Sequence, residues 1–175
     1  MAYSNIPHEM RHFNQWVLWK YEDEAGATKP TKVPYSANPH SFGRNAAVND
    51  PGTWASFDAC VAVLANRDCG YDGLGFVLSE TDPYVFIDLD DTNGHTENLQ
   101  RQIKVYETFA TYSEYSPSGK GLHLIGRGSV PLGAKRSSIE IYSKLRFMTM
   151  TGNRYGNSDI RDVSDLALTL YGQMK

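Results

Sequence analysis

Two aspartates stand two residues apart in an otherwise apolar run, Tyr84-Val-Phe-Ile-Asp88-Leu-Asp90. In a strand, alternate side chains share a face, so Asp88 and Asp90 would project together from points ~7 Å apart along the backbone. Carboxylates this close repel each other unless a cation neutralises them, and Mg²⁺ and Mn²⁺ bind carboxylate oxygens. The pair therefore predicts a divalent-metal site, and a strand end that leads into a polar loop is the alternative.

Two further polar residues interrupt apolar strands in the same way. His123 stands between two leucines, and Glu140 stands between two isoleucines. Alone, His123 is typical of a structural histidine and Glu140 of a solvated edge strand. Together with the aspartates they predict one shared face, on which three carboxylates serve two metal ions and the histidine can hold a phosphate.

A turn rich in glycine and serine, Ser116-Pro-Ser118-Gly119-Lys120-Gly121, precedes His123. Backbone N–H groups in such a turn can form a nest for an anion. The turn lacks the spacing of a Walker A loop and leads into a strand instead of a helix. The sequence predicts a phosphate-binding turn, and an exposed hairpin turn is the alternative.

Charge is distributed unevenly along the chain. The net charge is −3, but the seven basic residues of segment 117–158 against one acidic residue, Glu140, give +6 and leave −9 for the rest. This asymmetry predicts an anionic ligand near the basic segment, with a solvated basic surface as the alternative. The seven basic residues are Lys120, Arg127, Lys135, Arg136, Lys144, Arg146 and Arg154.

These residues need strands and helices to position them. Periodicity and turn signals predict helices at 50–66, 97–110 and 165–172, and strands at 15–21, 31–35, 73–78, 84–90, 111–115, 122–126, 138–142 and 147–151. We expect strands 73–78 and 84–90 to be neighbours, and the buried stripe of the middle helix to be Leu99, Ile103 and Tyr106. The fold class is α+β, an antiparallel or mixed sheet with helices on one side.

Composition excludes several other classes of protein. With 175 residues, 41% hydrophobic and 21% charged, the chain has the composition of a globular domain. No apolar run approaches the ~18 residues of a membrane helix, and the N-terminus lacks signal-peptide features, so a cytoplasmic setting is expected. Cys60 and Cys69 form neither a disulfide framework nor a thiolate zinc site, so we expect free thiols and no zinc.

The motif order resembles that of the archaeo-eukaryotic primase superfamily. The three motifs are Asp88-x-Asp90, Ser118-Gly-Lys-Gly-x-His123 and Ile139-Glu140. The chain most closely resembles the primase–polymerase (PrimPol) domains of phage and plasmid replication proteins. Matching phrases are Lys32-Val-Pro-Tyr35, Asn49-Asp-Pro-x-Thr-Trp54, Gly73-Leu-Gly-Phe-Val77 and Arg146-Phe-Met-Thr-Met-Thr-Gly152.

The resemblance implies one catalytic domain over residues 1–175. An N-terminal α/β unit, approximately 1–72, would pack with an RRM-like catalytic unit, 73–175, with the active site in the cleft between them. The implied activity is that of a DNA primase/polymerase, a nucleotidyltransferase that extends a 3′-hydroxyl or a first nucleotide under direction of a template.

The resemblance also implies roles for individual residues. Two divalent ions, Mg²⁺ or Mn²⁺, would be held by Asp88, Asp90 and Glu140. The nucleotide's triphosphate would be held by His123, Ser118, Gly119, Lys120 and Arg146. The resemblance makes Lys32 a weaker candidate for a contact to DNA, and the charge of the basic segment adds Lys135, Arg136 and Lys144 as weak candidates.

Implied partners are a DNA template or primer–template and dNTPs or NTPs, in the cytoplasm of a bacterial host of a phage or plasmid. A helicase or helical-bundle domain would lie elsewhere on the parent chain or on a partner. Because the family associates the helical bundle with primer initiation, its absence from this sequence puts priming in question more than extension. Two alternatives remain. A replication-initiator nuclease needs a His-hydrophobic-His pair, and the strand offers His123 alone; the other alternative is a non-catalytic nucleotide- or DNA-binding module.

Overall fold

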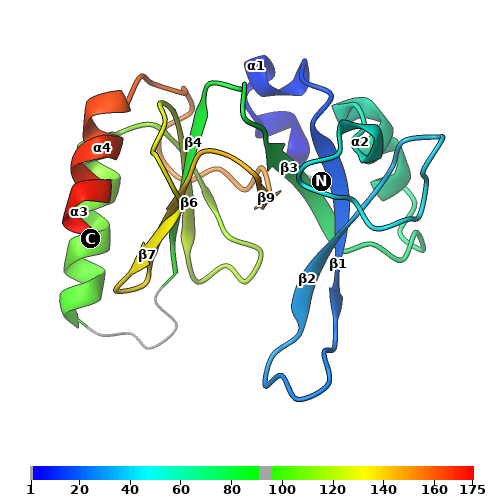
Figure 1. Ribbon diagram of the computed structural model, residues 1–175, viewed down its shortest axis with the longest axis horizontal. Coiled ribbons are helices and arrows are strands. Elements are labelled where there is room, and N and C mark those ends of the chain that lie inside the picture. The colour runs from blue at the N-terminus through cyan, green and yellow to red at the C-terminus, as the bar shows by residue number, and fades with distance from the viewer. Residues whose placement is uncertain (1, 91–95) are drawn as a thin grey trace. The chain divides into compact units, whose positions relative to one another are not determined.

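The computed structural model describes residues 2–90 and 96–175. Short helices open the chain and longer ones cover its second half (Figure 1). The helical elements are η1 (Ala2–Asn5), α1 (His8–Arg11), η2 (Pro51–Thr53), α2 (Phe57–Leu64), α3 (Thr96–Phe109) and α4 (Ser164–Gln173). The strands are β1 (Trp16–Glu22), β2 (Thr31–Tyr35), β3 (Gly73–Leu78), β4 (Tyr84–Leu89), β5 (Tyr112–Tyr115), β6 (Leu122–Arg127), β7 (Ala134–Arg136), β8 (Ile139–Tyr142) and β9 (Arg146–Met150).

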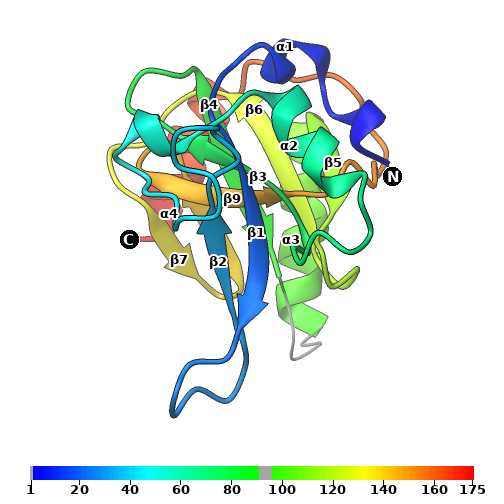
Figure 2. The ribbon, with the colours of Figure 1, turned by 90° about the vertical axis from the view of Figure 1, so that its right-hand side faces the viewer.

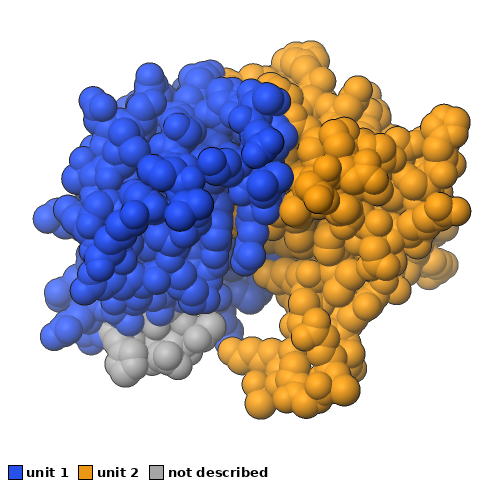
Figure 3. All heavy atoms as spheres, viewed as in Figure 1, with its two compact units in different colours: residues 1–7, 78–146, 151–175 blue, residues 8–77, 147–150 orange. Residues whose placement is uncertain are grey.

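The chain divides into two compact units (Figure 3). Unit 1 comprises residues 1–7, 78–146 and 151–175, and unit 2 comprises residues 8–77 and 147–150. The expected units were residues 1–72 and 73–175, whereas the two units of the structure correspond to the two sheets. Residues of β3 and β9 belong with the N-terminal strands, because β3 pairs with β1 and β9 pairs with β3. An active-site cleft between the units stays a prediction.

Unit 2 is built on the sheet order β2-β1-β3-β9. β1 and β2 form an antiparallel hairpin, from the pair Leu18↔Tyr35 to the pair Glu22↔Thr31, and its loop forms the lower end of the ribbon in Figure 2. The Trp16 ring is fully buried, with centroids 5.1 Å from Phe57 and 5.0 Å from Phe76.

The helix predicted over 50–66 is two elements. Asp50 accepts a hydrogen bond from the Gly52 amide at 3.0 Å and caps the proline-led η2. Ser56 then accepts from the Ala59 amide at 3.2 Å and starts α2. The prediction was wrong in joining them, because each segment has its own N-terminal cap. Within α2, Cys60 is a free, buried thiol whose pKa burial raises to about 12, and Cys69 is also free.

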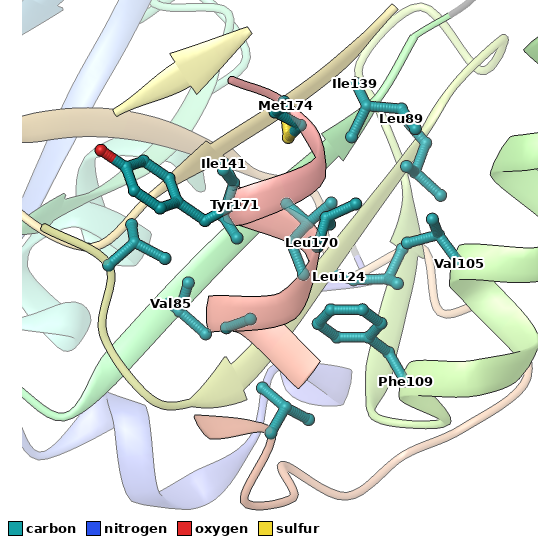
Figure 4. Packing of buried hydrophobic residues seen from close by; sticks show 14 residues of the cluster. Val85, Leu89, Val105, Phe109, Leu124, Ile139, Ile141, Leu170, Tyr171 and Met174 are labelled. Carbon is teal, nitrogen blue, oxygen red and sulfur yellow. The ribbon is translucent and has the colours of Figure 1, made fainter. Parts of the chain in front are cut away.

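Unit 1 is built on an antiparallel sheet with the order β5-β6-β4-β8-β7. Helices α3 and α4 lie side by side on one face of this sheet (Figure 1). Its core joins that face to the two helices (Figure 4), and alternate residues of the strands supply it. The core includes Val85, Ile87, Leu89, Leu124, Ile139 and Ile141 from the strands, with Val105, Phe109, Leu170 and Met174 from the helices. The predicted α+β class with helices on one side is confirmed.

Two sequence-based expectations about packing were wrong. Strands β3 and β4 are not neighbours, because β3 pairs with β1 while β4 pairs with β6 and β8. The turn between them is closed by Asp82, which accepts from the Ser79 and Tyr84 amides at 2.6 and 3.0 Å, and carries the chain from one sheet to the other.

The predicted buried stripe of α3 is also displaced. Leu99 and Ile103 are 51% and 46% exposed, while Gln102, Val105 and Phe109 are buried. Both sets of residues recur at helical spacing. The buried set was not recognised because it includes a polar residue, Gln102, whose side chain donates to the Ser138 carbonyl at 3.1 Å. Across residues 2–90 and 96–175, no helix has the length and apolar character needed to cross a membrane.

Candidate active site

Five polar residues lie side by side across the sheet of unit 1. In the strand register, Asp88 of β4 is opposite His123 of β6 on one side and Glu140 of β8 on the other. His123 is in turn opposite Glu114 of β5, and Glu140 is opposite Lys135 of β7. Directly opposed residues of antiparallel strands share a face. We call these five residues the polar row.

The polar row lies on the sheet face away from α3 and α4. The residues on either side of Asp88, His123 and Glu140 pack into the helix-facing core, so their own side chains must emerge on the opposite face. A slip of one residue in register would bury the charges and expose the core, which fixes the alignment strongly. The predicted shared face of Asp88, His123 and Glu140 is therefore present.

His123 is held from three sides. Its residue surface is 2% exposed, and Nδ1 lies 3.2 Å from Oε1 of Glu114. Its Nε2 lies 3.9 Å from Oδ1 of Asp88, and the ring centroid lies 4.9 Å from that of Phe86. A ligand that reaches His123 from the Nε2 side therefore approaches beside Asp88.

Sequence reasoning missed Glu114. This glutamate is 0% exposed within β5, the segment Tyr112-Ser-Glu-Tyr115. An acidic residue in a predicted strand that begins and ends with a tyrosine is a signal that could have been followed, since a buried carboxylate needs partners. The partner, His123, lies on a different strand, and the spacing of the two residues along the chain does not reveal their contact.

Glu140 is surrounded by donors. It accepts hydrogen bonds from Nζ of Lys135 and from the Tyr142 hydroxyl, the latter at 2.7 Å, and Nη2 of Arg146 lies 4.0 Å away. Burial raises the pKa of Glu140, but these hydrogen bonds and positive charges outweigh burial and hold that pKa below its ordinary value. Burial, with the hydrogen bond to Glu140, raises the pKa of Tyr142 to about 12.

Replacement of Glu140 by glutamine is expected to remove a pH-dependent contribution to stability. Because the folded state lowers the Glu140 pKa, the carboxylate stabilises the fold above its ordinary value of 4.5, and this contribution is lost as pH falls through the lowered folded-state pKa. Thermal melts should therefore show wild type and Glu140→Gln differing most at neutral pH and converging in acid. Glu24→Gln, in an exposed loop, is the control; a pH-independent difference for Glu140→Gln would contradict the prediction.

The Ser116–Gly121 turn lies against the end of β4. A Cβ at Gly121 would stand 2.7 Å from the Leu89 carbonyl oxygen and 3.3 Å from Cα of Asp90, so only glycine allows this close approach. Ser118, Gly119 and Lys120 are exposed on the same turn. The turn is thereby placed next to Asp90, as a phosphate-binding role beside the aspartates requires.

The amides of this turn are engaged within it. The Gly119 amide donates to the Ser116 carbonyl at 2.8 Å, the Lys120 amide to Oγ of Ser118 at 3.2 Å, and the Gly121 amide to Oγ of Ser116 at 3.1 Å. An anion nest made of these three amides would require the turn to open. The exposed Lys120 ammonium is the more direct group for a phosphate.

The remaining predicted contacts are dispersed. Lys32 lies in β2 of unit 2, with Nζ 5.9 Å from the Trp19 ring centroid. Arg136 donates to the Gln173 carbonyl at 3.0 Å and so holds the end of α4, away from the polar row. Lys144 is exposed in the segment between β8 and β9, and the guanidinium of Arg146 lies 4.6 Å from the Tyr142 ring centroid.

The predicted metal ligands differ in how they are placed. Asp88 and Glu140 are opposed in register, and Asp90 is exposed just beyond β4, where its amide donates to the Ser138 carbonyl at 3.1 Å. Among the described residues, no group of three or more His, Cys, Asp or Glu side chains is arranged to hold a metal ion. The donor set itself, carboxylates on one face, has the chemistry that hard divalent cations prefer. The alternative interpretation of Asp88 and Asp90 was a strand end that leads into a polar loop. That loop begins at residue 91, and residues 91–95 lie outside the described part of the chain.

Comparison with known proteins gives one informative match. No family model matches the chain. The chain is 35% identical over 177 residues to the DNA primase-polymerase of Nitratiruptor phage NrS-1. The match covers 94% of this chain and 22% of that relative, so the chain spans about a fifth of the relative's length. The predicted resemblance to phage-type primase–polymerases is confirmed.

Proposed function

Because this chain is related to part of a phage-type DNA primase–polymerase, we propose that it is a catalytic domain for template-directed nucleotidyl transfer in phage or plasmid replication. The observation that carries the proposal is the polar row, in which Asp88, His123 and Glu140 are opposed in register on the sheet face away from α3 and α4. These residues belong to the motifs that carry the family resemblance. A purely structural role for the sheet would not require three such side chains on the face away from α3 and α4.

In the proposed reaction, the oxygen of a primer 3′-hydroxyl attacks the α-phosphorus of a nucleoside triphosphate. A phosphorus–oxygen bond forms to the primer, the hydroxyl proton passes to solvent, the bond between the α-phosphorus and the β-phosphate oxygen breaks, and pyrophosphate leaves. The chain has to align these atoms and offset negative charge on the triphosphate. Positioning and electrostatic stabilisation supply most of the catalysis in reactions of phosphoryl groups.

The carboxylates of Asp88, Asp90 and Glu140 would hold two divalent ions, Mg²⁺ or Mn²⁺. When bound, such ions stabilise charge on the attacking and leaving oxygens of an in-line displacement. Asp88 is the central ligand, since its side chain is 24% exposed at the middle of the polar row. Glu140 would share its oxygens with Lys135 and Tyr142, whose hydrogen bonds keep it ionised.

Positive groups around the carboxylates would hold the triphosphate. Lys120 is exposed on the turn that abuts Asp90, and Arg146 lies beside Glu140. His123 would contribute from its Nε2 side, and Ser118 and Gly119 would contact phosphate if the turn opens. Lys32, Lys135 and Lys144 are the proposed contacts to the DNA backbone, whereas the bond from Arg136 to α4 makes it the weakest of that group.

The proposed substrates are a DNA primer–template and dNTPs or NTPs. A helicase or helical-bundle domain elsewhere on the parent chain, or on a partner, is part of the same proposal, and so is the cytoplasm of the host cell. The DNA and nucleotide substrates are supported by the name of the relative, a DNA primase-polymerase encoded by a phage, whereas the helicase or helical-bundle domain is proposed from the family resemblance alone.

A primer-extension assay tests the proposal. The folded chain is mixed with a labelled primer–template, dNTPs and Mg²⁺ or Mn²⁺, and we expect the primer to lengthen by template-directed addition. In parallel, DNA affinity measured at increasing salt should fall, because phosphate contacts release counterions. DNA binding without any extension would overturn the proposed activity in favour of a non-catalytic binding module.

A further inference from the structure

Glu114 lies at one end of the polar row and accepts hydrogen bonds on both carboxylate oxygens. Its Oε1 accepts from the Thr151 amide at 2.8 Å and contacts Nδ1 of His123 at 3.2 Å. Its Oε2 accepts from the Gly152 amide at 2.8 Å and from the Tyr112 hydroxyl at 2.9 Å. The carboxylate is therefore enclosed by four hydrogen-bonding partners from three segments of the chain.

This environment suits an ionised carboxylate. An ionised glutamate only accepts hydrogen bonds, two of the partners are amides that can only donate, and Tyr112 and His123 can both donate as well. The residue is 0% exposed, so its charge has lost hydration that the four bonds must replace. Since apolar residues often stabilise an interior as well as buried charges do, stability alone does not account for a carboxylate here.

The contact with His123 suggests what the carboxylate does. Two backbone amides and a tyrosine hold Glu114 in place, so it presents a fixed acceptor to Nδ1 of the imidazole. A proton on Nδ1 is thereby committed to Glu114, and the Nε2 edge is left for the side of Asp88. The ring of Phe86 packs against the same imidazole and limits its rotation.

We propose that Glu114 is a positioning residue: it holds the Nδ1 proton of His123 and thereby aims Nε2 at the place where Asp88 and the triphosphate meet. The proposal deepens the proposed function and rests on it. Glu114 touches neither substrate nor metal in this scheme. It acts through His123, just as a carboxylate in a metal site can orient a histidine ligand without binding the metal itself.

The first test is spectroscopic and needs no activity. In the chain labelled with ¹⁵N-histidine, the His123 ring signals are identified by their absence in His123→Ala. We expect Nδ1 of His123 to carry a proton in the wild type, and Glu114→Gln to replace this single signature by a mixture of tautomers. An unprotonated Nδ1 in the wild type would overturn the proposal, even if Glu114→Gln does not fold.

The second test is a double-mutant cycle in primer extension. Glu114→Gln and His123→Ala are each expected to lower the extension rate by about 10–100-fold, the range seen when an outer carboxylate is removed. The double variant should lie within about twofold of His123→Ala alone, because Glu114 acts through His123. Losses that multiply in the double variant would overturn the proposal.

Thr111→Val is the matched structural control. Its hydroxyl donates to the Ile125 carbonyl at 2.6 Å and accepts from the Arg161 amide at 3.0 Å, so the change removes two hydrogen bonds next to β5 without touching His123. We expect a lower melting temperature and an extension rate within about twofold of wild type. A loss of rate as large as that of Glu114→Gln would overturn the positioning role. If the wild type itself does not extend primers, the proposed function fails, and the histidine spectrum still decides the contact.

Discussion

Replacement of Asp88 by asparagine is expected to lower the rate of primer extension at least about a hundredfold, which corresponds to about 2.7 kcal/mol of lost transition-state stabilisation. The substitution preserves size and removes the charge at the centre of the polar row, where metal ions would be held between Asp88 and Glu140. Single-nucleotide incorporation under single-turnover conditions measures the effect on the chemical step.

Asp165→Asn provides the matched control for this experiment. Asp165 is an exposed carboxylate in the first turn of α4, on the helix side of the sheet, and the same change of charge there should leave the rate unaltered. Both variants should melt like the wild type to within a few degrees. A folded Asp88→Asn chain that retains more than half of the wild-type rate would remove Asp88 from the site.

Replacement of Leu124 by alanine is expected to lower the free energy of unfolding by about 2–5 kcal/mol, the cost of a cavity at a large aliphatic residue in a core. Leu124 is 0% exposed and is opposed in register to Ile87, on the face that packs against α3 and α4. It also immediately follows His123 in β6. Urea denaturation followed by circular dichroism measures the change.

Leu124→Met is the control for volume. Methionine fills nearly the same space, so the loss should stay under about 1.5 kcal/mol. If Leu124→Ala costs under about 1 kcal/mol, as at a surface position, the sheet does not pack against the helices through this residue.

The shared face of Asp88, His123 and Glu140 could be predicted because it depends on local alternation. Each residue stands between two aliphatic residues in its own strand, and the period of two fixes its face before any pairing is known. The register then brings the three faces together. The bounds of β2 and β3 were also predicted, although neither strand alternates between buried and exposed residues.

Features that depend on pairing between distant segments could not be predicted in this way. The division of β3 and β4 between two sheets depends on which strands they meet, and the turn between them is compatible with either arrangement. The three-residue β7 is too short to show a period. Glu114 could not be assigned to the polar row from the sequence, because its position opposite His123 depends on the pairing of β5 with β6.

Within the site, the roles of several residues depend on their hydrogen-bonding partners, which the spacing along the sequence does not reveal. Glycines and serines in the Ser116–Gly121 turn are compatible with an anion nest, but the serine hydroxyls and the Ser116 carbonyl take up the amides. Arg136 and Lys135 are adjacent and each carries one positive charge, yet Arg136 holds the end of α4 and Lys135 binds Glu140. A count of charges cannot separate these two roles.

The course of the chain between its sheets has a consequence for synthesis. The sheet of unit 2 takes its last strand from β9, whose residues 147–150 belong to that unit and are made after most of unit 1. Folding on the ribosome usually proceeds from the N-terminus, unit by unit. Here the edge of β3 has to wait, unpaired on that side, until the ribosome has released β9, so the sheet of unit 2 cannot be completed before most of unit 1 has been synthesised.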